Sequence, residues 1–226
     1  GVNFWEERMP AGRQVGRSAP TLRFGRTREG LPQAVLRHSL AWLAPAQPSL
    51  RDALLREERE LVLTVDPRVE EVRVEWRGVF SPGPRADTLS LSGANYHGLG
   101  MRFPAEFDLA ASFLNSEGAA YSAAQTGDVT PAAWSAAAGA LGGREVMVAL
   151  GASPRNAGSS RFFSMRQPFA YLSATQNLDQ QPIHPGRQRE WRLDYLVLVY
   201  PAHQNADFLK GDRKSTRLNS SHANIS

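Results

Sequence analysis

His97 lies in the part of the sequence whose residue types offer the most chemistry. The segment Asn95-Tyr-His-Gly-Leu-Gly-Met-Arg102 places an amide, an imidazole and a guanidinium beside two glycines. Glycine lets a ligand approach the backbone closely, and imidazole can gain or lose a proton near neutral pH. The pattern suggests His97 as an acid/base residue, with Asn95 and Arg102 as substrate-binding residues. A tight turn that leads into a strand would explain the same pattern.

A second polar cluster, Asn115-Ser-Glu-Gly118, follows an apolar stretch. Glu117 could act as a general base or accept a hydrogen bond from a sugar hydroxyl, and Asn115 could bind substrate. An ordinary turn accounts for the same residues. Arg166 lies in an aromatic-rich segment and could bind an anion or a hydroxyl.

Aromatic side chains add the contact surface that sugars commonly need. Trp42, Trp76 and Trp191 lie on the apolar sides of expected strands, so core packing explains them best. Trp5 lies outside these strands, and we count it among the candidate substrate-binding residues.

The elements expected to position these residues are mostly short strands. Alternation of apolar and polar residues is clearest at 72–77, where Val72, Val74 and Trp76 share one side. The expected strands span 34–43, 60–65, 72–77, 87–92, 99–103, 145–150, 162–173 and 191–200. Helix signals are weak and confined to 50–60 and 131–138. The sequence therefore predicts a mainly β fold, an antiparallel β-sandwich.

The composition changes abruptly near Gly211. Residues 1–211 are predicted to form one β-sandwich domain, whereas 212–226 are polar and predicted to be disordered. Back-translation of 212–222 resembles a common sequencing adapter, so this tail is expected to be non-native and the domain a fragment truncated at both ends. The tail has three basic residues and one acidic residue, so it accounts for two of the four net positive charges.

Several function classes have no support in the sequence. The chain has no cysteine, no HExxH pair, no phosphate-binding loop and no Gly-x-Ser-x-Gly motif, so no metal and no cofactor are predicted. Arginines are scattered rather than clustered, and no apolar run reaches the 20 or so residues of a membrane span. We expect a soluble protein with a small-molecule or oligosaccharide ligand, no nucleic acid and no membrane span. Its oligomeric state is unknown, and a periplasmic or secreted location stays open.

Several segments together resemble the bacterial PmoA-like family. These are the opening Gly1-Val-Asn-Phe-Trp-Glu6, the segments 96–102, 115–118 and 146–154, Arg166, and the late strand 191–200. The family is a domain of unknown function, often labelled "methane oxygenase PmoA". The resemblance implies a β-sandwich related to the galactose-mutarotase supersandwich and a role in carbohydrate metabolism. His97 stands where the family commonly has glycine, which puts a family-wide role for this histidine in doubt.

Three functions follow as alternatives. The first is an enzyme that modifies or isomerises a carbohydrate, with Glu117 or His97 as acid/base. The second is a non-catalytic carbohydrate-binding or structural β-sandwich module. The third, which we disfavour, is the oxygenase that the family label names, because the membrane-bound subunit behind that label needs spanning segments that this chain lacks.

Overall fold

The computed structural model describes residues 1–5, 10–47, 49–85, 87–108, 110–118, 127–156, 159–186 and 190–202. Strands dominate this part of the chain, with two short 3-10 helices. The elements are β1 (Arg13–Gly16), β2 (Thr21–Arg26), β3 (Pro32–Leu43), η1 (Leu50–Asp52), β4 (Leu55–Asp66), β5 (Glu71–Pro82), β6 (Gly98–Arg102), η2 (Ala105–Phe107), β7 (Ser112–Asn115), β8 (Asp128–Pro131), β9 (Trp134–Leu141), β10 (Arg144–Ala152), β11 (Arg161–Met165), β12 (Tyr171–Thr175) and β13 (Trp191–Pro201). The predicted tail lies outside the described residues.

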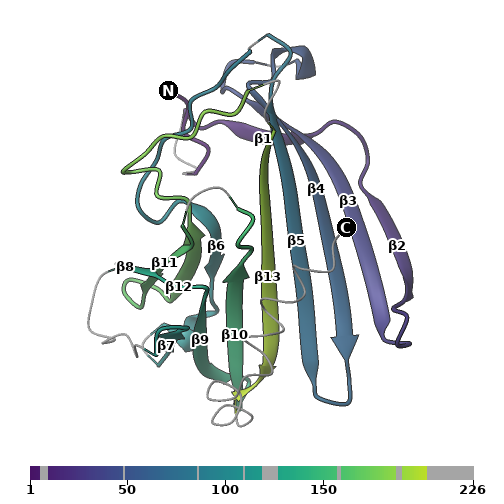
Figure 1. Ribbon diagram of the computed structural model, residues 1–226, viewed down its shortest axis with the longest axis vertical. Coiled ribbons are helices and arrows are strands. Elements are labelled where there is room, and N and C mark those ends of the chain that lie inside the picture. The colour runs from purple at the N-terminus through teal and green to yellow at the C-terminus, as the bar shows by residue number, and fades with distance from the viewer. Residues whose placement is uncertain are drawn as a thin grey trace.

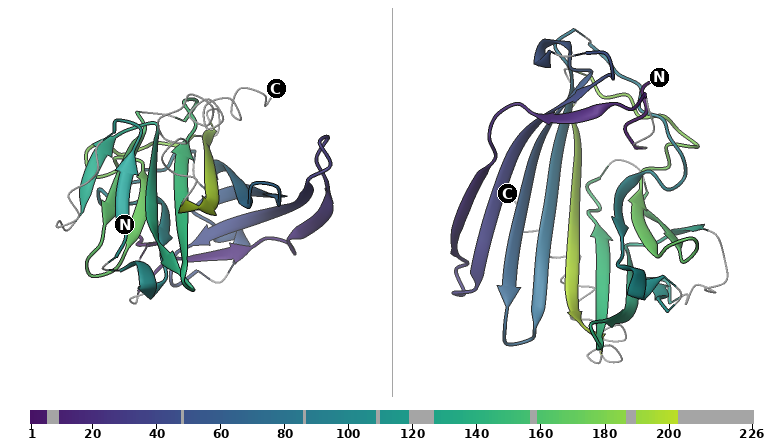
Figure 2. Two further views of the ribbon diagram at one scale, coloured as in Figure 1. Left: turned by 90° about the horizontal axis from the view of Figure 1, so that it is seen from below. Right: turned by 180° about the vertical axis from the view of Figure 1, so that it is seen from behind.

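Two antiparallel sheets pack together, which confirms the predicted β-sandwich. The nine-stranded sheet has the order β1-β3-β4-β5-β13-β10-β9-β7, and β2 pairs with β3. The four-stranded sheet has the order β6-β12-β11-β8. Figure 1 shows the small sheet beside the β9–β10 half of the large sheet, while β2, β3 and β4 lie beyond it. The view from behind in Figure 2 shows the same arrangement.

The main core lies between the two sheets. The large sheet contributes Phe80, Leu150 and Tyr195, and the small sheet contributes Phe162 and Leu172. These side chains point toward each other because successive residues of a strand face opposite sides. On β2 and β4 the same face of the large sheet continues with exposed apolar residues; Phe24 is 81% exposed and Leu63 is 39% exposed.

The helix predicted at 131–138 is wrong, because β9 runs through this segment from Trp134. Both faces of β9 are buried: Ala137 packs in the core between the sheets, and Ala136 packs in a second apolar cluster with Met147 and Leu196. Small side chains fit between two packed layers, so tertiary packing outweighs the helix propensity of alanine. The helix signal at 50–60 was also wrong, since only η1 is helical there and β4 begins at Leu55.

Two strand predictions need correction. The strand expected at 162–173 is two strands, β11 and β12, which pair with each other as a hairpin. The strand expected at 87–92 is reduced to isolated bridges, from Thr88 to Gly186 and from Leu91 to Ile183. The other expected strands correspond to β3, β4, β5, β6, β10 and β13.

Candidate functional site

Strands β6 and β12 bring three of the sequence-predicted residues to one face of the small sheet. Gly100 lies opposite Ser173, and Arg102 lies opposite Tyr171. Residues directly opposite each other in an antiparallel pair share a face, so these four residues lie on the same side. The opposite side of β12 carries Leu172, which is in the core. His97, Arg102 and the N-terminal Trp5 all reach the face that carries Tyr171.

Ring contacts on this face form a continuous chain, which we call the aromatic row. It consists of Trp5, Tyr96, His97, Tyr171, Phe169 and Arg102. Trp5 stacks on His97 with ring centroids 4.6 Å apart and an interplanar angle of 29°. The Trp5 ring also meets Tyr171 edge-on at 6.3 Å. Phe169 meets Tyr171 edge-on at 6.3 Å, and the Arg102 guanidinium lies over the Phe169 ring at 4.2 Å.

Three hydroxyl groups of β12 hold the loop that carries His97. Tyr171 and Ser173 both donate hydrogen bonds to the Tyr96 carbonyl, at 3.2 and 2.9 Å, and Thr175 donates to the His97 carbonyl at 3.2 Å. Such local polar anchoring fixes the backbone of a segment that has no strand pairing of its own. The position of the imidazole therefore depends directly on β12.

Gly100 allows Tyr171 to take its place in the row. A Cβ atom at position 100 would lie 2.0 Å from the Tyr171 hydroxyl oxygen. Any larger residue at this position would push the tyrosine ring aside. The sequence suggested that a ligand could approach the backbone at Gly100. In the folded chain, the Tyr171 side chain fills the space beside this glycine.

The loop that carries His97 also engages its imidazole ring. Its Nδ1 accepts a hydrogen bond from the Ala94 backbone N–H at 3.1 Å. A neutral imidazole has one donor and one acceptor nitrogen, so Nε2 carries the proton in this tautomer. The Ala94 contact therefore fixes the orientation of the His97 ring within its loop. Asn95 lies in the same loop and is exposed.

The Tyr171 hydroxyl stays protonated in this site. Burial raises the pKa of Tyr171 to about 12, the Ser173 hydroxyl partly offsets this rise, and Tyr96 adds to it. Tyr171 is 6% exposed, so its neutral hydroxyl holds the Tyr96 carbonyl at any physiological pH and its ring supports the exposed Trp5 from below.

The other predicted site residues lie elsewhere. Asn115 is buried at the end of β7, where its side chain accepts a hydrogen bond from the Glu117 backbone N–H at 2.9 Å. Glu117 is exposed, and its carboxylate accepts from the Ser116 hydroxyl at 3.0 Å. Arg166 donates to the Ala111 carbonyl at 3.3 Å, before the start of β7. The whole of β7 therefore separates Arg166 from Glu117, and β7 belongs to the nine-stranded sheet.

A polar cluster on the large sheet was missed by the sequence reasoning. Glu57 is fully buried, accepts two hydrogen bonds from Arg59 at 2.6 and 2.9 Å, and accepts one from the Trp42 indole at 3.0 Å. Arg59 also donates to Gln14 at 3.1 Å and lies over the Trp76 ring at 5.9 Å. The available signal was the alternation in Leu55-Arg-Glu-Glu-Arg-Glu-Leu61, which puts Glu57 and Arg59 on the side of the two leucines.

The N-terminal segment connects this cluster with the aromatic row. Phe4 contacts the Trp42 ring at a centroid distance of 5.1 Å, and the next residue, Trp5, stacks on His97. Consecutive Cα atoms are about 3.8 Å apart, so the two groups of side chains flank one short stretch of chain. The opening residues of the sequence thus help to build both groups.

Among the described residues, no three histidine, aspartate or glutamate side chains are grouped so that they could hold a metal ion. In the same part of the chain, no helix has the length and apolar character needed to cross a membrane.

Comparisons with known proteins show the family and a distant structural likeness. The structure is similar to the α-galactosidase from Lactobacillus brevis, with a TM-score of 0.38 and 10% identity; the match covers 87% of this chain and 30% of that one. No curated protein matches the sequence. The model of a family of unknown function, DUF6807, matches residues 1–210. Since the match covers most of the sequence, the chain belongs to the DUF6807 family.

Proposed function

We propose that this protein is a carbohydrate-binding domain whose sugar-contacting surface is the aromatic row. The observation that carries the proposal is the placement of Trp5: the residue is 39% exposed, yet its ring is held against His97, Tyr96 and Tyr171 by ring contacts. An exposed aromatic ring that is fixed in position offers a large contact area at a small cost in side-chain entropy. The apolar face of a sugar ring is a suitable partner for such a surface.

Polar groups at both ends of the row suit sugar hydroxyls. The loop of His97 lies at one end, and the Asn95 amide in that loop is exposed. Arg102 lies at the other end and is exposed above Phe169. A few convergent donors around an aromatic surface are typical of small-ligand sites, where they fix the orientation of the ligand.

Binding is favoured over a catalytic role by the positions of the acidic residues. A glycoside-modifying site commonly needs two acid/base groups a few ångströms apart. Glu117 lies beyond β7 in the other sheet, and both carboxylate oxygens of Glu57 already accept hydrogen bonds from Arg59. The enzyme alternative is tested by incubating the protein with each sugar that it binds. If a sugar is converted to a product, the function is catalysis and not binding alone.

Replacing Trp5 tests the proposal. After a glycan array identifies a ligand, we expect Trp5→Ala to weaken its binding by roughly 5- to 150-fold, taking the 1–3 kcal/mol of a base stacked on an aromatic side chain as a guide. Isothermal titration calorimetry would measure the change. Phe24→Ala is the matched control, because Phe24 is an exposed aromatic residue on β2.

Two results would contradict the proposal. One is an array with no bound sugar. The other is an affinity that Trp5→Ala and Phe24→Ala reduce equally, since this would indicate general apolar adhesion.

A further inference from the structure

A depression of about 500 Å³ lies at the beginning of β4, and its lining is rich in arginine. Four of its six lining residues are cationic: Arg17, Arg51, Arg56 and Arg85, with Leu50 and Pro84 as the apolar pair. Arg56 lies opposite Ala41, whereas Trp42 lies opposite Leu55. The depression is thus on the face of β3 and β4 opposite to Trp42, away from the aromatic row.

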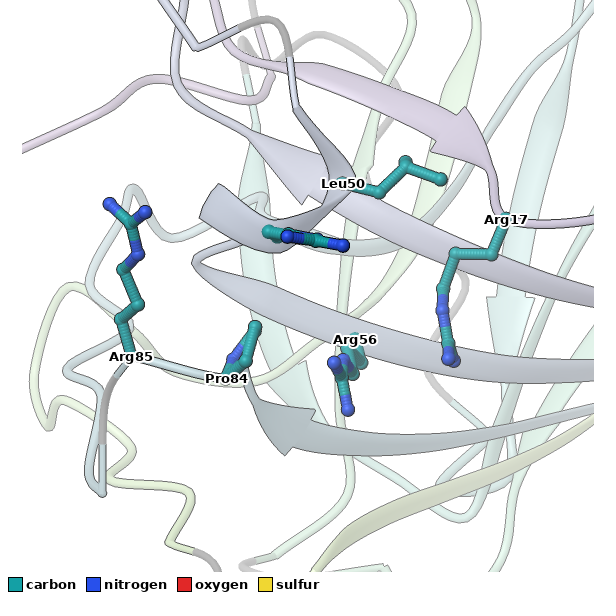
Figure 3. A pocket seen from close by; sticks show the side chains of 6 residues that line it. Arg17, Leu50, Arg56, Pro84 and Arg85 are labelled. Atoms are coloured by element: carbon teal, nitrogen blue, oxygen red, sulfur yellow. The ribbon is translucent and has the colours of Figure 1, made fainter.

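Strand pairing places Arg17 and Arg56 next to each other. The Arg17 backbone N–H donates to the Ser39 carbonyl at 2.9 Å, and its guanidinium crosses β3 to reach Glu58 on β4, also at 2.9 Å. Arg56 is two residues from Glu58 on the same face of β4, about 7 Å along the strand. In Figure 3 the Arg17 and Arg56 side chains point in the same direction, whereas Arg85 extends away from them.

Gly83 brings the other wall of the depression close to η1. Its backbone N–H donates to the Leu54 carbonyl at 2.8 Å, and a Cβ atom at this position would lie 1.6 Å from the Ala53 carbonyl oxygen. Only glycine permits this approach, which carries Pro84 and Arg85 against the segment that holds Arg51. The backbone contact at Gly83 therefore fixes the position of this wall in the fold.

The positive charge of the depression is only partly neutralised. Glu58 pairs with Arg17, and Asp52 pairs with Arg85 at 2.7 Å. Arg51 and Arg56 have no carboxylate partner in the part of the chain that the structure describes. The Nε of Arg56 is buried and has no hydrogen-bond acceptor there. Two guanidinium groups without a carboxylate partner leave an excess of positive charge at the depression, which an anion would balance.

We propose that this depression binds the oxyanion group of a small organic acid, such as a carboxylate or a phosphate ester. Arg56 and Arg51 would bind the oxyanion, because the planar guanidinium matches its geometry, and Leu50 and Pro84 would contact the rest of the ligand. A long polyanion fits less well, because Glu58, whose side chain is 57% exposed, would place a negative charge beside it. This inference is independent of the carbohydrate proposal, since the two sites share no residue.

Titration calorimetry with four probes that are not sugars, at constant ionic strength, tests the proposal: inorganic phosphate, sulfate, butyrate and glycerol 3-phosphate. We expect saturable binding of one ligand per chain, tighter for an organic probe than for the inorganic ions. Arg56→Gln should weaken it by tenfold or more. Arg23→Gln, which removes the same charge from the exposed strand β2, should leave it unchanged.

Folding of each variant is checked by circular dichroism, and Arg51→Gln on the exposed η1 replaces Arg56→Gln if the latter unfolds. Absence of saturable binding for all four probes would overturn the proposal. So would equal weakening by Arg23→Gln, which would indicate an unspecific charge effect. If the inorganic ions bind as tightly as both organic probes, the claim that the ligand is an organic acid would be wrong.

Discussion

Replacing Arg59 by alanine is expected to lower the free energy of unfolding by about 3–5 kcal/mol, because it leaves a buried carboxylate without its cation. Glu57 is fully buried and receives two of its three hydrogen bonds from Arg59. The Trp42 indole alone cannot offset the cost of burying that charge. Urea denaturation of the purified variant would measure the change.

Two comparisons make this prediction specific. Arg68→Ala removes an ion pair whose arginine side chain is 68% exposed, and we expect a loss below about 1 kcal/mol. The double variant Glu57→Leu/Arg59→Met removes both charges and should be more stable than Arg59→Ala alone, since no unpaired charge stays buried. A loss below 1 kcal/mol for Arg59→Ala, or a double variant that is less stable than the single one, would contradict the account.

The protein is also expected to lose several kcal/mol of stability between pH 10 and pH 12. Burial is the first cause that raises the pKa of three tyrosines above the usual value of 10: Tyr171 to about 12, and Tyr195 and Tyr200 further still. Above pH 10 the unfolded chain releases these protons while the folded chain keeps them, so rising pH favours unfolding. The stabilisation is complete below pH 10 and is lost as the pH rises through the folded-state values.

The size of the loss in stability follows from the change in tyrosine pKa between the unfolded and the folded chain. Each pKa unit corresponds to about 1.4 kcal/mol, so Tyr171 alone contributes on the order of 2–3 kcal/mol. Tyr195 and Tyr200 act in the same direction, and the total stability of a typical domain is only about 5–15 kcal/mol. Thermal denaturation at a series of pH values would measure how steeply the melting temperature falls with pH. Tyr171→Phe should make the slope shallower, and a melting temperature that stays constant from pH 10 to 12 would contradict the burial of these hydroxyls.

The sequence predicted strands well where only one face is buried. In β5, Val72, Val74 and Trp76 alternate with charged residues, and the period of two is visible in the letters. It failed for β9, because alanine on both faces gives no alternation and matches a helix equally well. It also failed at 50–60, where the charges of Glu57 and Arg59 concealed their position on an inward-facing side of β4.

The site was predictable only as far as local sequence determines it. His97 and Arg102 are close together in the chain, and a single loop and strand bring them to one face; Asn95 lies exposed in the same loop. Whether Glu117 joins them depends on the path of β7 through the other sheet, which no local pattern encodes. The stacking of Trp5 on His97 joins residues 92 positions apart, and it follows from the fold as a whole.

The most direct test of the carbohydrate proposal follows the tryptophan side chains during a sugar titration. The chain has five tryptophans, so a two-dimensional ¹H–¹⁵N spectrum separates their indole signals, and Trp5→Ala identifies the one from Trp5. We predict that the Trp5 signal shifts saturably with the added sugar, while the signal of Trp134, which is 7% exposed in the second apolar cluster, stays in place. A bound sugar that leaves the Trp5 signal unchanged would contradict the account.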